Sequence, residues 1–173
     1  GSVGKLEIMT TYPKTTPTAV AIICHPHPLY GGTMNNKVVT TIARAWHELG
    51  WATVRFNFRG VGRSEGDYGH TQGEMEDLRT IITWAQQQLP HLPLALAGFS
   101  FGAFIAARVA AEISLLQLVT IAPPVNHFDF THLAITCPWL IIHGSEDEIV
   151  PVQEVVAWAQ HLPVNAKFIL LPQ

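Results

Sequence analysis

The chain has 173 residues, of which 48% are hydrophobic and only 13% are charged, and its formal net charge is −3. This length predicts one domain with a substantial core, and the charged share is about half of the roughly 25% that is usual. The acidic balance and the lack of a basic cluster or a long apolar span argue against nucleic acid and membranes as partners.

The two cysteines, Cys24 and Cys137, each close an apolar run. Two thiols are too few for a disulfide framework, and a small buried apolar role is the commoner fate of a free cysteine. We therefore expect a reducing, cytoplasmic setting.

The first half of the chain alternates predicted strands and helices. Apolar and β-branched content predicts strands at residues 3–9, 18–24 and 51–58. Between the last two strands, apolar residues at helical spacing predict a helix over 35–49 that ends at Gly50.

Local signals mark where the helices begin. Asn35 or Asn36 is a good cap for the first one. Thr71 and Glu74 have the spacing of a capping box, which predicts a second helix that ends before Pro90.

The second half continues the alternation. Strands are predicted at residues 92–97, 115–122, 139–143 and 167–171, and helices at 101–112 and 151–161. Alternating strands and helices with nearly continuous apolar strands predict an α/β fold, a mostly parallel sheet with helices on both faces. No composition shift or repeat divides residues 1–173, so we expect a single domain.

The most informative stretch is Gly98-Phe99-Ser100-Phe101-Gly102, which follows an apolar strand and opens an Ala-rich helix. Such a sharp strand-to-helix turn lifts a serine hydroxyl off the sheet and places it at a helix N-terminus. Gly98 and Gly102 fit because a turn this tight leaves no room for side chains. This context favours Ser100 as a nucleophile over a serine in an ordinary turn.

A serine nucleophile needs a base and a carboxylate that orients the base. The carboxylate candidate is Asp147, in the loop after the strand at 139–143, where sites on open parallel sheets collect. Glu146 and Glu148 compete with it, and a solvated acidic loop is the alternative interpretation.

The segment after the strand at 18–24 is a candidate for stabilising negative charge. An oxyanion hole needs two preorganised backbone donors, and the amide of Phe101 supplies one. Pro26 and Pro28 have no N–H, so His27 is the residue of this turn that can supply the other. A zinc site on His25 and His27 is an alternative, but no nearby third ligand accompanies the pair. We therefore predict no metal and no cofactor.

Gly60-Val61-Gly62 follows a strand, but it does not match a dinucleotide-binding loop. That motif needs a third glycine at fixed spacing and an immediate helix. Here the third glycine, Gly66, comes one residue late, and a polar loop follows.

Together these features resemble the α/β-hydrolase superfamily. The Gly-Phe-Ser-Phe-Gly elbow, Arg-Gly-Val-Gly-Arg-Ser after a strand, and Asp147 before Val-Pro carry the resemblance over about residues 18–171. His-Pro-His-Pro-Leu-Tyr-Gly-Gly-Thr-Met-Asn-Asn and Arg-Phe-Asn-Phe-Arg-Gly resemble a small, cap-less bacterial group related to dienelactone hydrolases. True dienelactone hydrolases have cysteine where this chain has Ser100. The resemblance implies Ser100 as nucleophile, Asp147 as triad acid, and the His27 and Phe101 amides as oxyanion donors.

The chain departs from this family pattern at the base, because the family's histidine follows the last strand. All nine histidines precede residues 167–171. Of the internal ones, His143 closes a strand and fits a structural role, while His127 and His132 reach the site only if their loop folds over it. We expect the natural protein to continue beyond Gln173 with a loop that carries the base histidine and a terminal helix. As printed, the chain is expected to be inactive toward esters, and an uncovered sheet face would favour a homodimer.

The substrate prediction rests on the short connection at 123–136, which has no room for a cap domain. The site is therefore expected to be open, and Tyr30 and Phe99 are predicted to bind substrate. Core packing is the alternative role for these and the other nearby aromatic residues, Phe101, Phe128 and Phe130. We predict a serine hydrolase of the carboxylesterase type that acts on a small acyl ester through an acyl-enzyme. A catalytically silent binding or scaffold module, and an acyltransferase or perhydrolase, are the alternatives.

Overall fold

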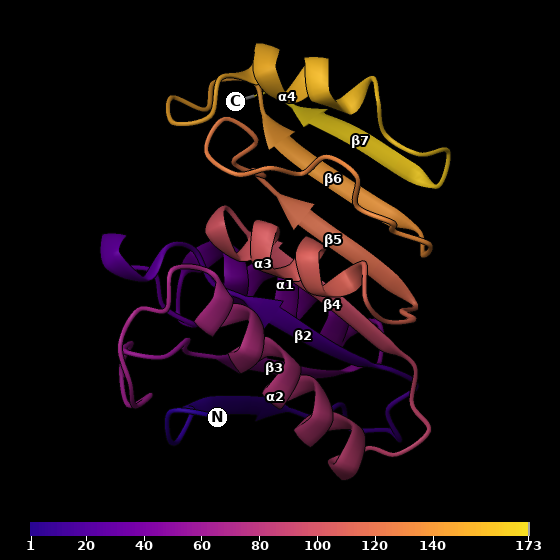
Figure 1. Cartoon of the computed structure of the whole chain (residues 1–173). Coiled ribbons are helices and arrows are strands. Elements are labelled where there is room, and N and C mark those ends of the chain that lie inside the picture. The colour runs from indigo at the N-terminus through magenta and orange to yellow at the C-terminus, as the bar shows by residue number, and fades with distance from the viewer. Residues whose placement is uncertain (173) are drawn as a thin grey trace.

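A computed structural model describes residues 1–172, which form a seven-stranded sheet with the strand order β1-β3-β2-β4-β5-β6-β7 (Figure 1). The strands are β1 (Ile8–Thr11), β2 (Val20–Cys24), β3 (Ala52–Phe56), β4 (Leu94–Phe99), β5 (Gln117–Ile121), β6 (Trp139–Gly144) and β7 (Ala166–Leu171). The helices are α1 (Lys37–Glu48), α2 (Gln72–Gln88), α3 (Phe101–Ala110) and α4 (Val152–Ala159), with a 3-10 turn, η1 (Pro28–Tyr30). None of the helices within residues 1–172 is both long and apolar enough to cross a bilayer.

The predicted α/β architecture is confirmed. β2 to β7 pair in parallel, and β1 pairs antiparallel with β3 at one edge. The prediction for the first strand was wrong in its extent, because the strand covers Ile8–Thr11 and not residues 3–9. The backbone of residues 5–7 instead bonds the loop after β3: Glu65 N donates to Lys5 O (2.9 Å), and Glu7 N donates to Ser64 Oγ (2.9 Å).

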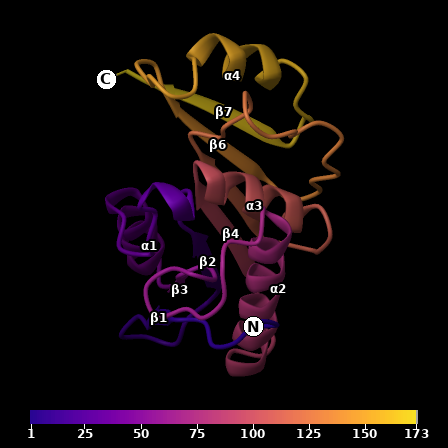
Figure 2. The ribbon, with the colours of Figure 1, turned by 60° about the vertical axis from the view of Figure 1, so that its left-hand side comes forward.

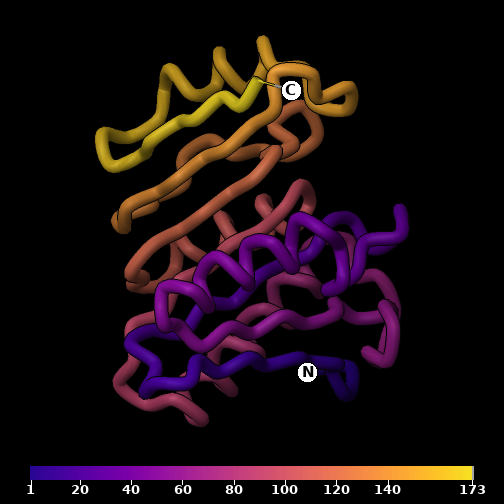
Figure 3. The backbone as a smooth tube through the Cα atoms, turned by 180° about the vertical axis from the view of Figure 1, so that it is seen from behind, coloured from indigo at the N-terminus to yellow at the C-terminus, as the bar shows by residue number. Residues whose placement is uncertain are grey.

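Helices cover both faces of the sheet. Among the helices of residues 1–172, α1 packs on one face, where Figure 3 shows it in front of the sheet. α2 and α3 cover the other face, and Trp158 of α4 packs there against Phe130 and Trp139 (Figure 2). The apolar residues of β2 and β4 alternate between the two cores, which explains why these strands are hydrophobic throughout.

Helix capping follows the sequence signals. Asn36 is the cap of α1, since its Oδ1 accepts the Val38 N–H at 2.8 Å. At the start of α2, the buried Glu74 carboxylate accepts the N–H groups of Gly69 (2.8 Å) and Thr71 (2.9 Å). The bond to Thr71, the N-cap of α2, is the one that the predicted capping box requires.

A buried histidine joins the ends of β2 and β3. The Phe58 N–H donates to His25 Nε2 at 3.0 Å, so Nδ1 carries the proton and donates to Pro26 O at 2.6 Å. The ring is therefore neutral, and burial lowers the pKa of His25 to about 4. This contact holds the start of the turn at residues 25–28 against β3.

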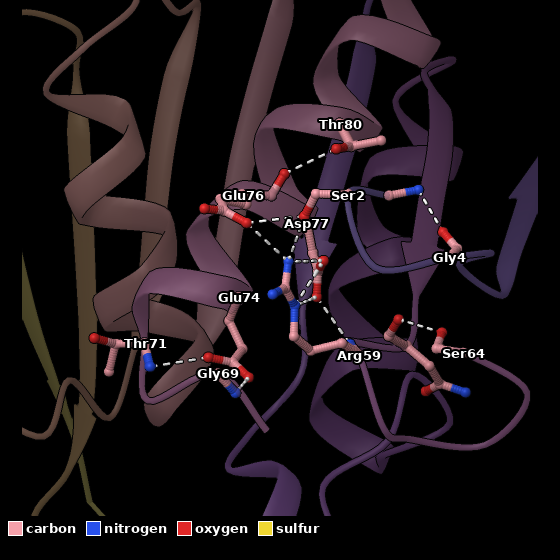
Figure 4. A network of polar contacts seen from close by, with 12 residues as sticks. Ser2, Gly4, Arg59, Ser64, Gly69, Thr71, Glu74, Glu76, Asp77 and Thr80 are labelled. Carbon is pink, nitrogen blue, oxygen red and sulfur yellow. Dashed lines mark hydrogen bonds and ion pairs between the residues drawn. The ribbon is translucent and has the colours of Figure 1, made fainter. Parts of the chain in front are cut away.

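A buried ion pair anchors the loop after β3. The Arg59 guanidinium bonds Asp77 on α2, with Nη2 and Oδ1 2.8 Å apart (Figure 4). Nη2 also lies 3.2 Å from Oε2 of the exposed Glu76 side chain. Asp77 Oδ2 also accepts the Arg59 backbone N–H at 2.8 Å. Asn57 and Ser64 lie within the same loop and bond each other through Ser64 Oγ and Asn57 O. The loop with Gly60 and Gly62 thus has a structural role.

The His25 contact predicts acid sensitivity. In the unfolded chain His25 titrates near its ordinary pKa of 6.5, so the unfolded state binds the proton first as pH falls. Stability contributed by the neutral ring is present above about pH 6.5 and is lost progressively down to about pH 4, by on the order of 3 kcal/mol in total. Urea unfolding between pH 7 and pH 4.5 should therefore show a flatter pH dependence for His25→Gln than for the native chain. The exposed His161→Gln is the control, and equal slopes for His25→Gln and the native chain would contradict the prediction.

The Arg59–Asp77 pair predicts an asymmetric response to loss of charge. Asp77→Asn leaves the buried guanidinium without its main counter-charge and should lower the free energy of unfolding by about 3 kcal/mol or more. Glu112→Gln breaks the exposed Arg79 pair and should cost about 1 kcal/mol or less. Urea denaturation at neutral pH measures both, and similar losses for the two variants would refute the role given to the buried pair.

Candidate active site

Ser100 lies in a strained turn between β4 and α3. Its backbone has φ 53° and ψ −119°, a conformation that non-glycine residues rarely adopt. The Ser100 N–H donates to Ile121 O at 2.9 Å, and Ser100 O accepts the Ala103 N–H at 2.8 Å. Strain of this kind is maintained only where the surrounding structure enforces it, and it concentrates at functional sites.

The two glycines of the motif make this turn possible. A Cβ on Gly98 would lie 2.0 Å from Gly102 O, and a Cβ on Gly102 would lie 2.4 Å from Cys24 O. Both contacts are with backbone, which cannot move aside as a flexible side chain can. The prediction that no side chain fits at Gly98 and Gly102 is therefore confirmed.

The turn opens into a cavity of about 450 Å³. It is lined by Pro26, His27, Tyr30, Phe99, Ser100, Phe101, Pro124, His127, Phe128 and Ile149. Five of the six residues predicted for the site are therefore brought together: His27, Tyr30, Phe99, Ser100 and Phe101. The sixth, Asp147, does not line the cavity, but its loop contributes Ile149.

The turn at residues 25–32 presents His27 to this cavity with a fixed side chain. His27 Nδ1 accepts the Leu29 N–H at 3.2 Å, and Nε2 is 3.3 Å from Tyr68 Oη. The ring centre lies 4.7 Å from those of Tyr30 and Phe101. Burial among these rings lowers the pKa of His27.

The zinc alternative does not fit this turn. Both ring nitrogens of His25 are used by backbone groups, and both nitrogens of His27 have partners of their own. Within residues 1–172 there is no group of three or more His, Cys, Asp or Glu side chains placed to hold a metal ion.

Two backbone donors beside Ser100 are free. Within residues 1–172, neither the His27 N–H nor the Phe101 N–H donates to a protein group. Phe101 is the first residue of α3, where N–H groups have no partner inside the helix. The positive end of the helix dipole lies at the same place. Both residues line the cavity that Ser100 faces.

Asp147 is the acidic residue of its loop whose carboxylate is held by backbone hydrogen bonds. Its Oδ1 accepts the N–H groups of Ile149 and Val150, both at 2.9 Å. The buried His143 reinforces the loop through Nε2, which donates to Val150 O at 3.0 Å. His143 therefore has the structural role expected for it, whereas Glu146 and Glu148 are exposed.

The connection at residues 123–136 forms one side of the cavity, a point that the sequence did not decide. Pro124, His127 and Phe128 line the cavity, and Phe128 packs on Phe101 and Phe104. Of the aromatic residues considered for the site, Phe130 packs away from it, between Phe104 and Trp158. No sequence signal indicated which residues of this connection reach the cavity, because long-range packing decides it.

Known proteins are similar to this chain in both sequence and fold. A structure of an α/β serine hydrolase homologue from Coxiella burnetii is 48% identical, with a TM-score of 0.95 over 99% of this chain and 84% of that one. A structure from Xanthomonas campestris, described as an α/β serine hydrolase without lid, is 43% identical, with a TM-score of 0.94 over 100% of this chain and 81% of that one.

An uncharacterized protein of Rickettsia prowazekii is 40% identical over 148 residues, which are 82% of this chain and 62% of that protein. The chain therefore spans about three fifths of the length of this relative. The model of the family described as "Serine aminopeptidase, S33" matches residues 15–130. With the elbow, the sheet order and these relatives in agreement, the chain belongs to the α/β hydrolases, in the family of that description.

Proposed function

We propose that the whole protein is a carboxylesterase that transfers a small acyl group to Ser100 and then to water. The observation that carries the proposal is the strained Ser100 turn, which opens into a cavity beside two free backbone N–H groups. A nucleophile and an oxyanion site in this arrangement are what acyl transfer requires.

In the proposed reaction, a base removes the proton of the Ser100 hydroxyl while Oγ attacks the carbonyl carbon of the ester. The His27 and Phe101 N–H groups stabilise the oxyanion of the tetrahedral intermediate. Collapse of this intermediate expels the alcohol, which takes the proton from the base. Water then attacks the acyl-enzyme by the same route and releases the acid.

The base is proposed to be a histidine that follows residue 173 in the whole protein and is oriented by Asp147. Two observations support this position. Ser145 N donates to Leu171 O at 2.9 Å, and Leu171 pairs with Gly144 in the sheet. The end of β7 therefore lies beside the Asp147 loop. His127 is the internal alternative, because it lines the cavity.

The cavity lining supports an uncharged ester as substrate. Aromatic rings, prolines and Ile149 make up most of it, and it contains no carboxylate within the described residues. A substrate with a free α-ammonium group, as in an aminopeptidase reaction, would enter this lining without a counter-charge. The short connection at residues 123–136 leaves the mouth of the cavity open, which suits a lid-less hydrolase.

Ser100→Ala should abolish hydrolysis of p-nitrophenyl acetate by the whole protein, with a loss of about 10⁴-fold or more in kcat, because no other group can form the acyl-enzyme. A fluorophosphonate probe should label the native protein at Ser100. Ser114→Ala, at an exposed serine far from the cavity, is the matched control and should keep both activities. Native turnover that survives in Ser100→Ala would remove the proposal.

Asp147→Asn keeps an oxygen for the Ile149 and Val150 N–H groups but loses the charge that orients the base. We expect kcat to fall by about 10³- to 10⁴-fold while the fold is kept. Glu146→Gln and Glu148→Gln, two neutralised neighbours, should retain activity. His127→Ala distinguishes the two candidate bases: near-native kcat supports a histidine after residue 173, and a loss as large as that of Asp147→Asn would assign the base to His127.

A further inference from the structure

A second concave site lies between α1 and the sheet edge formed by β3 and β1. It is a groove of about 220 Å³ lined by Thr11, Thr40, Ala43, Arg44, His47, Thr53 and Arg55. No residue is shared with the lining of the Ser100 cavity. Figure 3 shows the face on which α1 lies. We call this site the α1 groove.

The fold places these residues side by side in a rigid setting. Thr40, Arg44 and His47 recur on one side of α1 at a spacing of four and three residues. On the sheet, Thr11 is the register partner of Thr53, two residues before Arg55 on β3. Regular elements therefore hold every side chain of the α1 groove.

Within residues 1–172, neither arginine of the groove forms an ion pair with a carboxylate. Arg59, Arg63 and Arg79 have acidic partners, whereas Arg108, outside the groove, forms no ion pair within residues 1–172. Arg55 is half-buried, yet within residues 1–172 its guanidinium contacts only neutral groups: Met34 O at 2.7 Å, Asn35 Oδ1 at 3.3 Å and Met9 Sδ at 2.7 Å. Arg44 likewise forms no ion pair in the described chain. A partly buried cation of this kind gains stability from an anion.

Further hydrogen-bonding groups line the same space. The Nδ1 atom of His47 is buried and has no hydrogen-bond partner in the part of the chain that the structure describes. Thr53 is buried at the floor, and the structure assigns no bond to its hydroxyl or to that of Thr11. The Thr40 hydroxyl, in contrast, already donates to Lys37 O at 3.0 Å.

We propose that the α1 groove binds a phosphate-type oxyanion. Phosphate oxygens accept hydrogen bonds from guanidinium and hydroxyl groups. The α1 groove presents two guanidinium groups, of Arg44 and Arg55, and two free hydroxyls, of Thr11 and Thr53. The volume is below the roughly 300–1,000 Å³ of pockets for drug-sized ligands. The small volume favours inorganic phosphate or a small phosphate monoester as the ligand.

The test is calorimetric titration of the purified protein with inorganic phosphate and with methyl phosphate at constant ionic strength. Arg44→Gln removes an exposed charge, and Thr53→Val removes a hydroxyl while keeping the side-chain shape. Arg44→Gln should weaken phosphate binding by about tenfold, the equivalent of about 1.4 kcal/mol, and Thr53→Val should weaken it by a smaller factor. Arg108→Gln, at an exposed arginine of α3 outside the groove, is the matched control and should bind as the native protein does.

Saturable binding that is weakened by both groove variants and kept by Arg108→Gln supports the α1 groove as the site. Tighter binding of methyl phosphate than of inorganic phosphate would identify a phosphate ester as the ligand, and the reverse order would identify free phosphate. Absence of saturable binding up to millimolar phosphate overturns the proposal. Binding that Arg44→Gln and Thr53→Val leave unchanged overturns it equally.

Discussion

The backbones of β4, α3 and β2 meet so closely around Gly98 and Gly102 that no side chain fits between them. A Cβ at either position would overlap carbonyl groups of the neighbouring element. This contact forces the chain to reverse within a single residue, and Ser100 takes the positive φ that the reversal requires. The position of Ser100 at the cavity, the free Phe101 amide and the start of α3 all result from the same close packing.

Two further segments at the cavity are each held by a buried histidine. His25 links the turn before η1 to the backbone of Phe58, and His143 links the Asp147 loop through Val150. Both rings act on backbone groups and not on substrate. The geometry of the site therefore depends on two fully buried imidazoles.

The elements and the elbow could be predicted because their signals are local. Apolar strands, the cap at Asn36 and Gly98, which packs against Gly102, act within a few residues of their own positions. Features that depend on distant contacts could not be predicted in the same way. The Arg59–Asp77 pair joins residues from different elements, and the packing of the 123–136 connection on Phe101 decides which of its side chains face the cavity. The short first strand was misjudged for the same reason, since residues 5–7 bond to a loop almost sixty residues away.

The rim of the Ser100 cavity is built differently from its floor. Tyr30 and Ile149 are 86% and 74% exposed, whereas Phe101 beneath them is buried. Side chains with so little burial contribute little to the core, so exchanging them changes the shape of the opening at small cost in folding free energy. The buried residues that hold the reacting groups and the exposed residues that shape the opening for the substrate can therefore diverge independently among related proteins.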